Sequence, residues 1–418
     1  MNTPNEKFDV NIGHAGILGN RILGELNKLR ELEPVHWSPA SGCWLVTRHE
    51  DIMKALEGDA LPLSYKRLVA ATLPHVPEAD RVRLYPTLMR YMPNWIIDVD
   101  PPVHTRLRKL LVAAFNKKVM DEVKPFVVER VALLMDMMQK KPTMEFGEDA
   151  ARLLPGSVIL KLLGVPQENL LRLKEWSQAF NSAVAVPGVT HDALMRCENA
   201  FVDMNKLFAT VIDMRRAKPE NDLISALIEA NDAGDKLSHE EMLGACQLII
   251  VAGHDTTHSS MCLGTAALAS HPEYWDYMYQ HPEENFNCTL ELIRYMAMST
   301  SQPRFVIADF EWHGKQLKKG DVVFLMHAAG NRDPRVFAEP EKLDHTRKNL
   351  DQSLSFSPGL HHCIGHLLAK LQLAEFFGAL VKNFSGAELL DEELHWMPQI
   401  AFRGIHDVNM RFTPRKPA

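Results

Sequence analysis

The sequence predicts a single, mainly α-helical protein with small β-sheet regions, because helical periodicity dominates it and strand signals are few. Residues 119–139 repeat apolar side chains at i, i+3, i+4 and i+7 spacing. A second helix is expected over 239–269, where Ser238 and Glu241 form a capping box and His271-Pro272 marks the end. At 1.5 Å per residue this helix would be about 45 Å long, enough to cross a domain.

The remaining elements follow from local signals. The double proline Pro101-Pro102 opens a helix within 100–111. Strands are expected within 43–47, 304–314 and 321–326, with Gly314 and Gly320 as turn residues. No repeat, linker or internal boundary divides the sequence. Residues 1–418 are therefore expected to form one domain, with a mobile N-terminal segment over 1–15.

Composition narrows the class of protein. The 418 residues are 46% hydrophobic and 24% charged, which is typical of a globular protein. A net charge of −7 gives no basic excess, so a nucleic-acid partner is not expected. The six cysteines are scattered, which favours a reducing compartment. We find no leader-like start and no apolar run long enough to span a bilayer, so a cytoplasmic monomer without a membrane anchor is expected.

The segment FSPGLHHCIGHLLAKLQLAEFF, residues 356–377, is the most informative. Its second half has helical periodicity, and its first half contains Pro358 and Gly359 and must turn. Cys363 therefore lies at or just before a helix N-terminus, where backbone N–H groups and the helix dipole favour a thiolate. A structural cysteine is one alternative. A zinc site with His361, His362 and His366 is another, although this spacing is not typical of zinc.

A second unusual segment, VAGHDTTHSS, occupies residues 251–260 at the centre of the long helix. Gly253 costs about 1 kcal/mol relative to alanine in a helix interior. The serine and threonine hydroxyls can bond back to carbonyls of the preceding turn and bend the helix. Such local departures from helix rules are expected at functional sites. Close packing of small residues between helices is the structural alternative.

These two segments resemble the sequence signatures of the cytochrome P450 family. Phe356, Gly359, His361, Cys363 and Gly365 match its haem-binding signature, and the segment 252–257 matches its oxygen-activating pattern Ala-Gly-x-Asp-Thr-Thr. The resemblance runs from about residue 104 to 403. It implies a triangular-prism haem-thiolate monooxygenase fold in which Cys363 is the axial ligand of the iron of haem b.

The resemblance also implies roles for individual residues. Asp255 and Thr256 would deliver protons to bound O2, and Ala252 and Gly253 would leave room for it. Phe356 would pack near the sulfur, and Gly365 would let the haem lie against the backbone. The haem propionates would be bound by His104, Arg108, Arg304 and His361. Glu291, Arg294 and Arg347 would form a structural group.

By the same resemblance, the protein would hydroxylate or epoxidise a lipophilic small molecule such as a terpenoid, steroid, fatty acid or polyketide. Electrons would come from NAD(P)H through a separate ferredoxin and ferredoxin reductase, for which Lys109, Lys117 and Lys118 offer a docking face or merely a solvated one. A haem protein that binds or senses a gas without turnover is the alternative. The expected substrate pocket is apolar and includes Leu88, Met89, Met92, Trp95, Phe180, Val184, Met298, Ile400 and Phe402.

Overall fold

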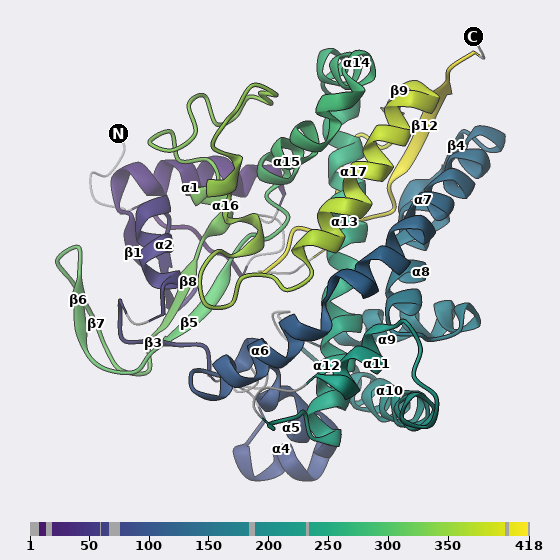
Figure 1. The fold of residues 1–418 in the computed structure, drawn as a ribbon. Helices are drawn as coiled ribbons and strands as arrows, with labels where there is room; N and C mark the ends of the chain where they lie inside the picture. Colours follow the sequence, from purple (N-terminus) through teal and green to yellow (C-terminus); the bar gives the residue numbers. More distant parts are fainter. Residues whose placement is uncertain are drawn as a thin grey trace, which may run out of the picture. The chain divides into compact units, whose positions relative to one another are not determined.

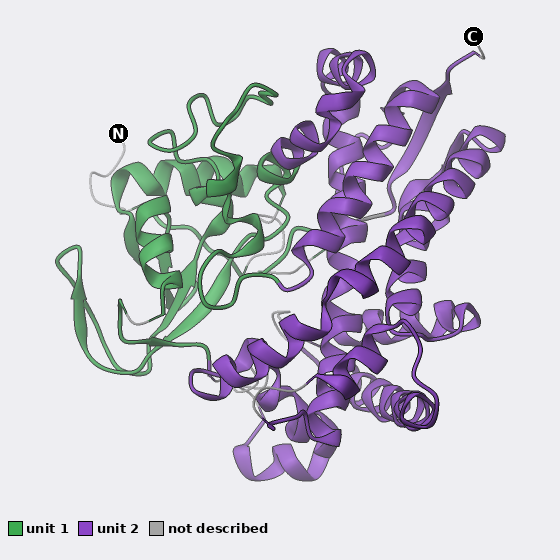
Figure 2. Cartoon of the chain, in the orientation of Figure 1, with its two compact units in different colours: residues 1–65, 293–363, 396–404 green, residues 66–292, 364–395, 405–418 purple. Residues whose placement is uncertain are grey.

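A computed structural model describes residues 8–13, 19–58, 60–66, 76–183, 189–230, 234–397 and 401–416. Helices dominate these residues, as the sequence predicts (Figure 1). Of the predicted N-terminal segment 1–15, only residues 8–13 are among those described. The chain divides into two compact units, each assembled from separate stretches of sequence (Figure 2). Unit 1 comprises 1–65, 293–363 and 396–404, and unit 2 comprises 66–292, 364–395 and 405–418.

Unit 1 is built on a five-stranded sheet in the order β1-β2-β8-β5-β3. Strand β2 pairs with β8 in parallel, and the other neighbours are antiparallel. The predicted strand at 304–314 is interrupted, because β5 ends at Val306 and β6 begins at Phe310 in a separate hairpin that turns at His313 and Gly314. The elements of this unit are α1 (Asn20–Leu32), β1 (Val35–Ser38), β2 (Cys43–Val46), α2 (His49–Leu56), β3 (Leu63–Ser64), β5 (Gln302–Val306), β6 (Phe310–Trp312), β7 (Lys315–Leu317), β8 (Val322–Leu325) and α16 (His327–Gly330).

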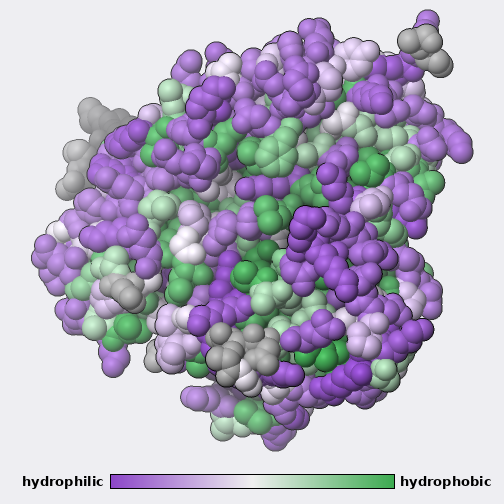
Figure 3. Space-filling view, viewed as in Figure 1, coloured by the Kyte–Doolittle hydropathy of each residue, from purple (hydrophilic) through white to green (hydrophobic). Residues whose placement is uncertain are grey.

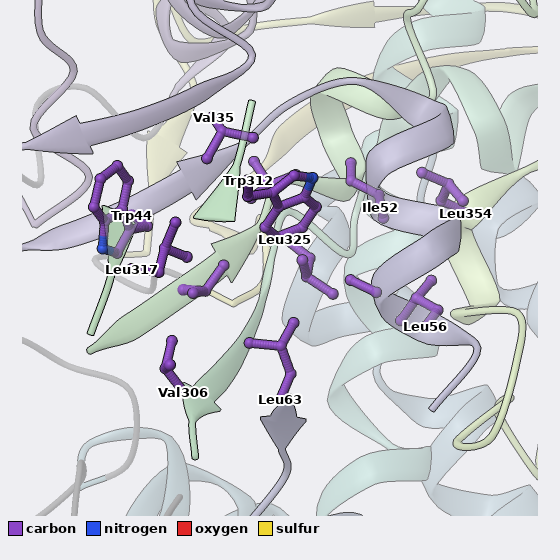
Figure 4. Close-up of a cluster of buried hydrophobic side chains, with 13 residues drawn as sticks. Val35, Trp44, Ile52, Leu56, Leu63, Val306, Trp312, Leu317, Leu325 and Leu354 are labelled. Carbon is purple, nitrogen blue, oxygen red and sulfur yellow. The ribbon is translucent and has the colours of Figure 1, made fainter. Parts of the chain in front are cut away.

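A buried apolar cluster fixes α2 against this sheet (Figure 4). Ile52 and Leu56 of α2 pack with Leu325 of β8 and with Leu354, which precedes the cysteine loop. Burying side chains of this size contributes about 1.5–3 kcal/mol each. The loop that carries Cys363 therefore starts from a packed core.

Unit 2 is mostly helical. Helix α7 (Lys117–Lys140) confirms the helix predicted over 119–139, and its N-cap Asn116 accepts a hydrogen bond from the backbone of Val119. Helix α17 (His366–Asn383) lies beside both α7 and α13 (Figure 1). The other helices are α4 (Glu78–Leu84), α5 (Pro86–Tyr91), α6 (Val103–Ala114), α8 (Leu153–Leu162), α9 (Leu170–Asn181), α10 (His191–Ala217), α11 (Leu223–Glu229), α12 (His239–Gly253), α13 (Asp255–Ala269) and α14 (Pro272–Gln280).

Short strands complete the description. In unit 2, β4 (Thr143–Glu145), β12 (Asn409–Pro414) and β9 (Phe384–Leu389) form an antiparallel three-stranded sheet. Strand β10 (His395–Trp396) pairs with β11 (Ile405–His406), and α15 (Asn285–Met296) spans the boundary in sequence between the two units. The face shown in Figure 3 is mostly hydrophilic, with hydrophobic side chains scattered over it. Among the described residues, no helix is long and apolar enough to cross a membrane.

Candidate functional site

The cysteine loop of unit 1 is held by its own backbone. A short 3-10 helix ends at Phe356, Ser357 adopts a left-handed conformation at φ +51, and the Cys363 N–H donates to the Phe356 carbonyl at 2.9 Å. Gly359 has φ +99, and a Cβ at this position would lie 2.2 Å from the Leu56 carbonyl oxygen. Only glycine fits both constraints. The two ends of the signature, Phe356 and Cys363, are thus brought together by a turn that requires Gly359.

Cys363 differs from the other cysteines of the chain in its exposure. It is exposed, whereas Cys43, Cys197, Cys246, Cys262 and Cys288 are buried. Burial raises the pKa of the Cys43 and Cys246 thiols to about 12, so these groups stay protonated. Because the thiolate is the form that binds a metal, Cys363 is the cysteine suited to ligation. No group of three or more His, Cys, Asp or Glu side chains among the described residues could hold a metal ion, which gives no support to the zinc alternative.

The helix predicted over 239–269 is present in unit 2 but broken at His254, between α12 and α13. Its predicted start is confirmed, because Ser238 and Glu241 make the capping box. At the break, the Thr256 hydroxyl donates to the Ala252 carbonyl at 2.6 Å, and the Ser260 hydroxyl donates to the Thr256 carbonyl at 2.8 Å. These are the backward hydrogen bonds that the sequence predicts, and bonds of this kind bend helices.

Gly253, at the end of α12, has a packing role. A Cβ there would lie 2.6 Å from the Ile159 Cδ1 atom of α8, so glycine lets the two helices approach closely. Ala252 is exposed. That Ala252 and Gly253 leave room for O2 stays a prediction.

Asp255, the first residue of α13, is anchored by two side chains of unit 2, from Arg152 at the N-cap of α8 and from Asn181 at the end of α9. One carboxylate oxygen accepts from the Arg152 guanidinium at 2.8 Å, and the other accepts from the Asn181 amide at 2.6 Å. Arg152 also donates to Glu148 at 2.8 Å, and Glu148 pairs with Lys174 at 2.6 Å. Although burial raises the pKa of Glu148, its bond from Lys174 and the charge of Arg152 outweigh this and hold the pKa below its usual value. Charged side chains in contact therefore connect the half-exposed Lys174 to Asp255, through Glu148 and Arg152.

His254 lies beside this carboxylate and is fully buried. Its Nδ1 atom is 3.3 Å from Asp255 Oδ1 and 3.2 Å from the Ser177 hydroxyl. Burial lowers the pKa of His254 despite the neighbouring Asp255 carboxylate. The imidazole is therefore neutral near pH 7.

The four predicted propionate-binding residues are divided between the units. In unit 2, His104 and Arg108 lie one turn apart on α6; His104 is buried, and burial together with the Arg108 charge lowers its pKa. In unit 1, Arg304 of β5 is 2% exposed, and its guanidinium donates to the Pro303 carbonyl and the Gln302 side chain. His361 stands in the cysteine loop of the same unit. Each unit therefore contains one arginine and one histidine of the predicted set.

The predicted structural group is buried. Glu291 and Arg294 are both 0% exposed, and Arg294 donates to the carbonyls of Asn331 and Pro340 at 2.8 and 3.0 Å. Arg347 donates to the Ala338 carbonyl at 2.7 Å. Arginines that hold loop carbonyls in this way stabilise the loops of unit 1.

Several predicted pocket residues are core residues. Leu88, Met92 and Trp95 are buried, and the ring of Trp95 packs 5.9 Å from Phe180 and 5.7 Å from Phe201. In unit 1, Met298 is half-buried, and the exposed Phe402 forms a β-bridge with Ser299. Met89 is half-buried on α5. Val184 and Ile400 lie outside the described residues, and the composition of the pocket stays a prediction.

Sequence reasoning did not identify Arg152 or Asn181, which hold Asp255. Arg152 lies in the segment ARLLPG, and Asn181 ends α9. Neither stands in a motif, and each meets Asp255 only through tertiary packing of α8 and α9 near α12 and α13. No signal in a single sequence would have found them.

The chemistry of the donor set fits haem. Cys363 offers an exposed thiol, a Cβ at Gly365 would meet no atom within 4 Å, and two arginine–histidine pairs are suited to carboxylate groups. The comparisons with known proteins agree. The family model described as cytochrome P450 matches residues 159–285 and 287–397, more than half of the chain.

Relatives match this chain along nearly its whole length. The polyketide biosynthesis cytochrome P450 PksS of Bacillus subtilis is 29% identical, over 92% of this chain and 94% of that protein. Mycinamicin IV hydroxylase/epoxidase of Micromonospora griseorubida is 32% identical, over 92% and 94%. The solved structure of P450BioI in complex with hexadec-9Z-enoic acid ligated acyl carrier protein has a TM-score of 0.85 at 27% identity, over 95% and 99%. The chain therefore belongs to the cytochrome P450 family and is a monooxygenase that uses haem b and O2, with electrons from NAD(P)H supplied through redox partners.

Proposed function

We propose that this protein hydroxylates or epoxidises a lipophilic small molecule and receives its electrons from a ferredoxin and ferredoxin reductase. The observation that carries the proposal is the acid and alcohol pair Asp255–Thr256, placed where α12 breaks into α13. Haem bound through the Cys363 thiolate would supply the O–O bond cleavage. The other steps depend on side chains of the chain itself.

Thr256 would hold a water molecule or O2. Because its hydroxyl donates to the Ala252 carbonyl at 2.6 Å, its oxygen lone pairs are left to accept a hydrogen bond. Rotation of the hydroxyl would then pass a proton on. A gas sensor needs no such group, so the pair favours turnover over gas sensing.

Asp255 would replace that proton from solvent. Arginine does not lose its proton in proteins, so Arg152 holds Asp255 as an anchored carboxylate while the pair is formed. Transfer of a proton through Asp255 requires its carboxylate to leave Arg152. Glu148 already shares the guanidinium of Arg152 and would keep that charge compensated when Asp255 turns away.

The expected substrate class is a polyketide or a fatty acyl compound, within the broader lipophilic range. This is supported by PksS, named for polyketide biosynthesis, and by the fatty acyl carrier protein bound to P450BioI. Free acids, macrocyclic polyketides and acyl groups carried on a carrier protein are the three forms to compare. A shift of the haem absorption spectrum on addition of each form reports binding.

The test is a turnover assay with a surrogate ferredoxin, its reductase and NADPH. We expect NADPH consumption to be accompanied by an oxygenated product, and Cys363→Ser to abolish product. Cys43→Ala, which removes a buried thiol from the same unit, is the matched control and should retain product formation. Haem-containing protein that consumes no NADPH above background with every substrate and redox partner tried would favour the gas-binding alternative.

A further inference from the structure

Three side chains that are distant in sequence form a stack in unit 1. The rings of Tyr65 and His361 lie 3.5 Å apart between centroids, with planes inclined by 20°. The Arg304 guanidinium carbon lies 3.6 Å from the centroid of the same Tyr65 ring. Tyr65 follows β3, Arg304 belongs to β5 and His361 belongs to the cysteine loop. One tyrosine therefore contacts two of the residues expected to bind haem propionates.

Steric limits place these two partners on opposite faces of the tyrosine. Both distances equal van der Waals contact, so each partner lies directly over the centre of the ring. One face of a phenol ring has room for only one such group. Tyr65 is consequently sandwiched, with the His361 imidazole on one side and the Arg304 guanidinium on the other.

The pairing of β3 with β5 places Arg304 beside Tyr65. Leu63 pairs with Val306 and Ser64 with Phe305 in antiparallel register. In the same register Tyr65, the residue after β3, comes opposite Arg304. Gln302 links this side to the cysteine loop, because its Oε1 atom accepts from the Arg304 guanidinium at 3.1 Å and from the Ser357 hydroxyl at 2.9 Å. Rotation of Arg304 about its stem is therefore restricted from two directions.

Burial of Tyr65 and Arg304 strengthens the electrostatic interaction between them. Tyr65 is 8% exposed and Arg304 is 2% exposed, so the guanidinium charge is poorly screened by water. His327, which is fully buried in the same unit, experiences that charge: burial and then Arg304 lower its pKa to about 3. The negatively polarised face of an aromatic ring attracts a guanidinium, and the attraction is greater when both are desolvated. Tyr65 thus contacts a strong local positive charge.

We propose that Tyr65 is a positioning residue of the haem site, which fixes the side chains of Arg304 and His361 in the orientation that binds a propionate carboxylate. The proposal rests on the proposed function, since it requires haem as the ligand. The aromatic ring carries the effect, through its two faces, and the hydroxyl is not required. Tyr65 is not a catalytic residue.

The experiment measures the rate at which the holoprotein loses haem to an excess of apomyoglobin. Tyr65→Leu removes both stacked contacts and should lose haem about tenfold faster, the order expected for loss of a desolvated cation–π contact. Tyr65→Phe keeps the ring and should stay within about twofold of the parent. Tyr65→Met, which fills the space with a flexible apolar chain, should behave like Tyr65→Leu and serves if the leucine variant does not fold.

Two controls separate positioning from general destabilisation. Trp312→Leu removes a buried aromatic ring that packs against Phe310 in the same unit, and should leave the haem loss rate unchanged. In an Arg304→Gln background, Tyr65→Leu should have a smaller effect, because the part that acts through Arg304 is lost and only the contact with His361 remains. This non-additivity is not expected of a residue that only stabilises the fold.

The inference is overturned if Tyr65→Leu and Tyr65→Met lose haem at the parent rate, if Tyr65→Phe is as defective as they are, or if the effect of Tyr65→Leu is undiminished in the Arg304→Gln background. Failure of the proposed function gives a different result. In that case the parent protein itself holds no haem, or holds haem but forms no product.

Discussion

The neighbouring residues Asp255 and Thr256 differ in how firmly they are held. The Thr256 hydroxyl donates to the Ala252 carbonyl of the preceding turn, whereas Asp255 accepts from Arg152 on one carboxylate oxygen and from Asn181 on the other. In a helix, threonine divides between two χ1 rotamers because its hydroxyl can bond to the i−3 or i−4 carbonyl. At the scale of single residues, the acid is therefore held by two side chains from other elements, and the alcohol is held by the backbone of the preceding turn.

Thr256→Ala should uncouple NADPH consumption from product formation. Without the hydroxyl, proton delivery slows, and the product formed per NADPH should fall by at least about tenfold while peroxide rises. Thr265→Ala removes a buried threonine from the same helix and should leave the ratio unchanged. Equal ratios in Thr256→Ala and the parent would show that this hydroxyl takes no part in the reaction.

Arg152 and Asp255 should be energetically coupled. We expect a double-mutant cycle with Arg152→Gln and Asp255→Asn, measured by urea unfolding, to give a coupling free energy of roughly 0.5–3 kcal/mol. The pair is mostly buried, with side chains 13% and 17% exposed, so solvent screens it only partly. Lys141 and Asp149, an exposed pair in the same unit, provide a matched cycle that should give less than about 1 kcal/mol. Additive effects in the first cycle would contradict the observed bond.

The sequence predicts some of the helices and strands near the site and not others. The capping box and the two ends of the helical region over 239–269 follow from spacing alone and are confirmed, although the region is divided into α12 and α13. The break at His254 was not located, because it results from local hydroxyl bonds together with the contact of α12 with α8 at Gly253. The sequence does not predict β1 or β3, because these short strands lack the continuous apolar run that marks β2 and are defined by their pairing partners.

Helix α13 carries a histidine that should make stability depend on pH. Burial lowers the pKa of His258 to about 3 from 6.5. As pH falls below 6.5, the unfolded chain binds a proton that the folded chain does not, so stability decreases with a slope of up to about 1.4 kcal/mol per pH unit. Urea unfolding between about pH 7 and pH 5 should show a slope smaller by this amount in His258→Gln. An identical slope in both proteins would mean that His258 is protonated in the folded state.

The conformation of the cysteine loop should depend on Gly359. Gly359→Ala places a Cβ against the Leu56 carbonyl and forces a positive φ on alanine, so we expect a loss of stability of at least about 1–3 kcal/mol and reduced haem content. Gly24→Ala, on an exposed position of α1 with no atom near its Cβ, should instead stabilise by up to about 1 kcal/mol. Thermal unfolding with haem quantification checks both. Normal stability and haem content in Gly359→Ala would contradict the conformation found for the loop.

At the scale of the whole molecule, the residues that the sequence predicts to contact haem are found in both compact units. Cys363, His361 and Arg304 belong to unit 1, and His104, Arg108 and Thr256 belong to unit 2. The sequence could predict these residues because each lies in a short motif that resembles a family signature. It could not predict Tyr65 or Arg152, which reach the site through strand register and helix packing and belong to no motif.

The central claim is that the Cys363 sulfur would bind the haem iron. The absorption spectrum of the reduced, carbon monoxide-bound protein tests it most directly, with Cys363→Ser and Cys43→Ala measured in parallel. The account predicts the long-wavelength Soret band of thiolate-ligated haem in the parent and in Cys43→Ala, and its loss in Cys363→Ser. A parent protein that shows the short-wavelength band of imidazole-ligated haem, or a Cys363→Ser variant that retains the long-wavelength band, would contradict it.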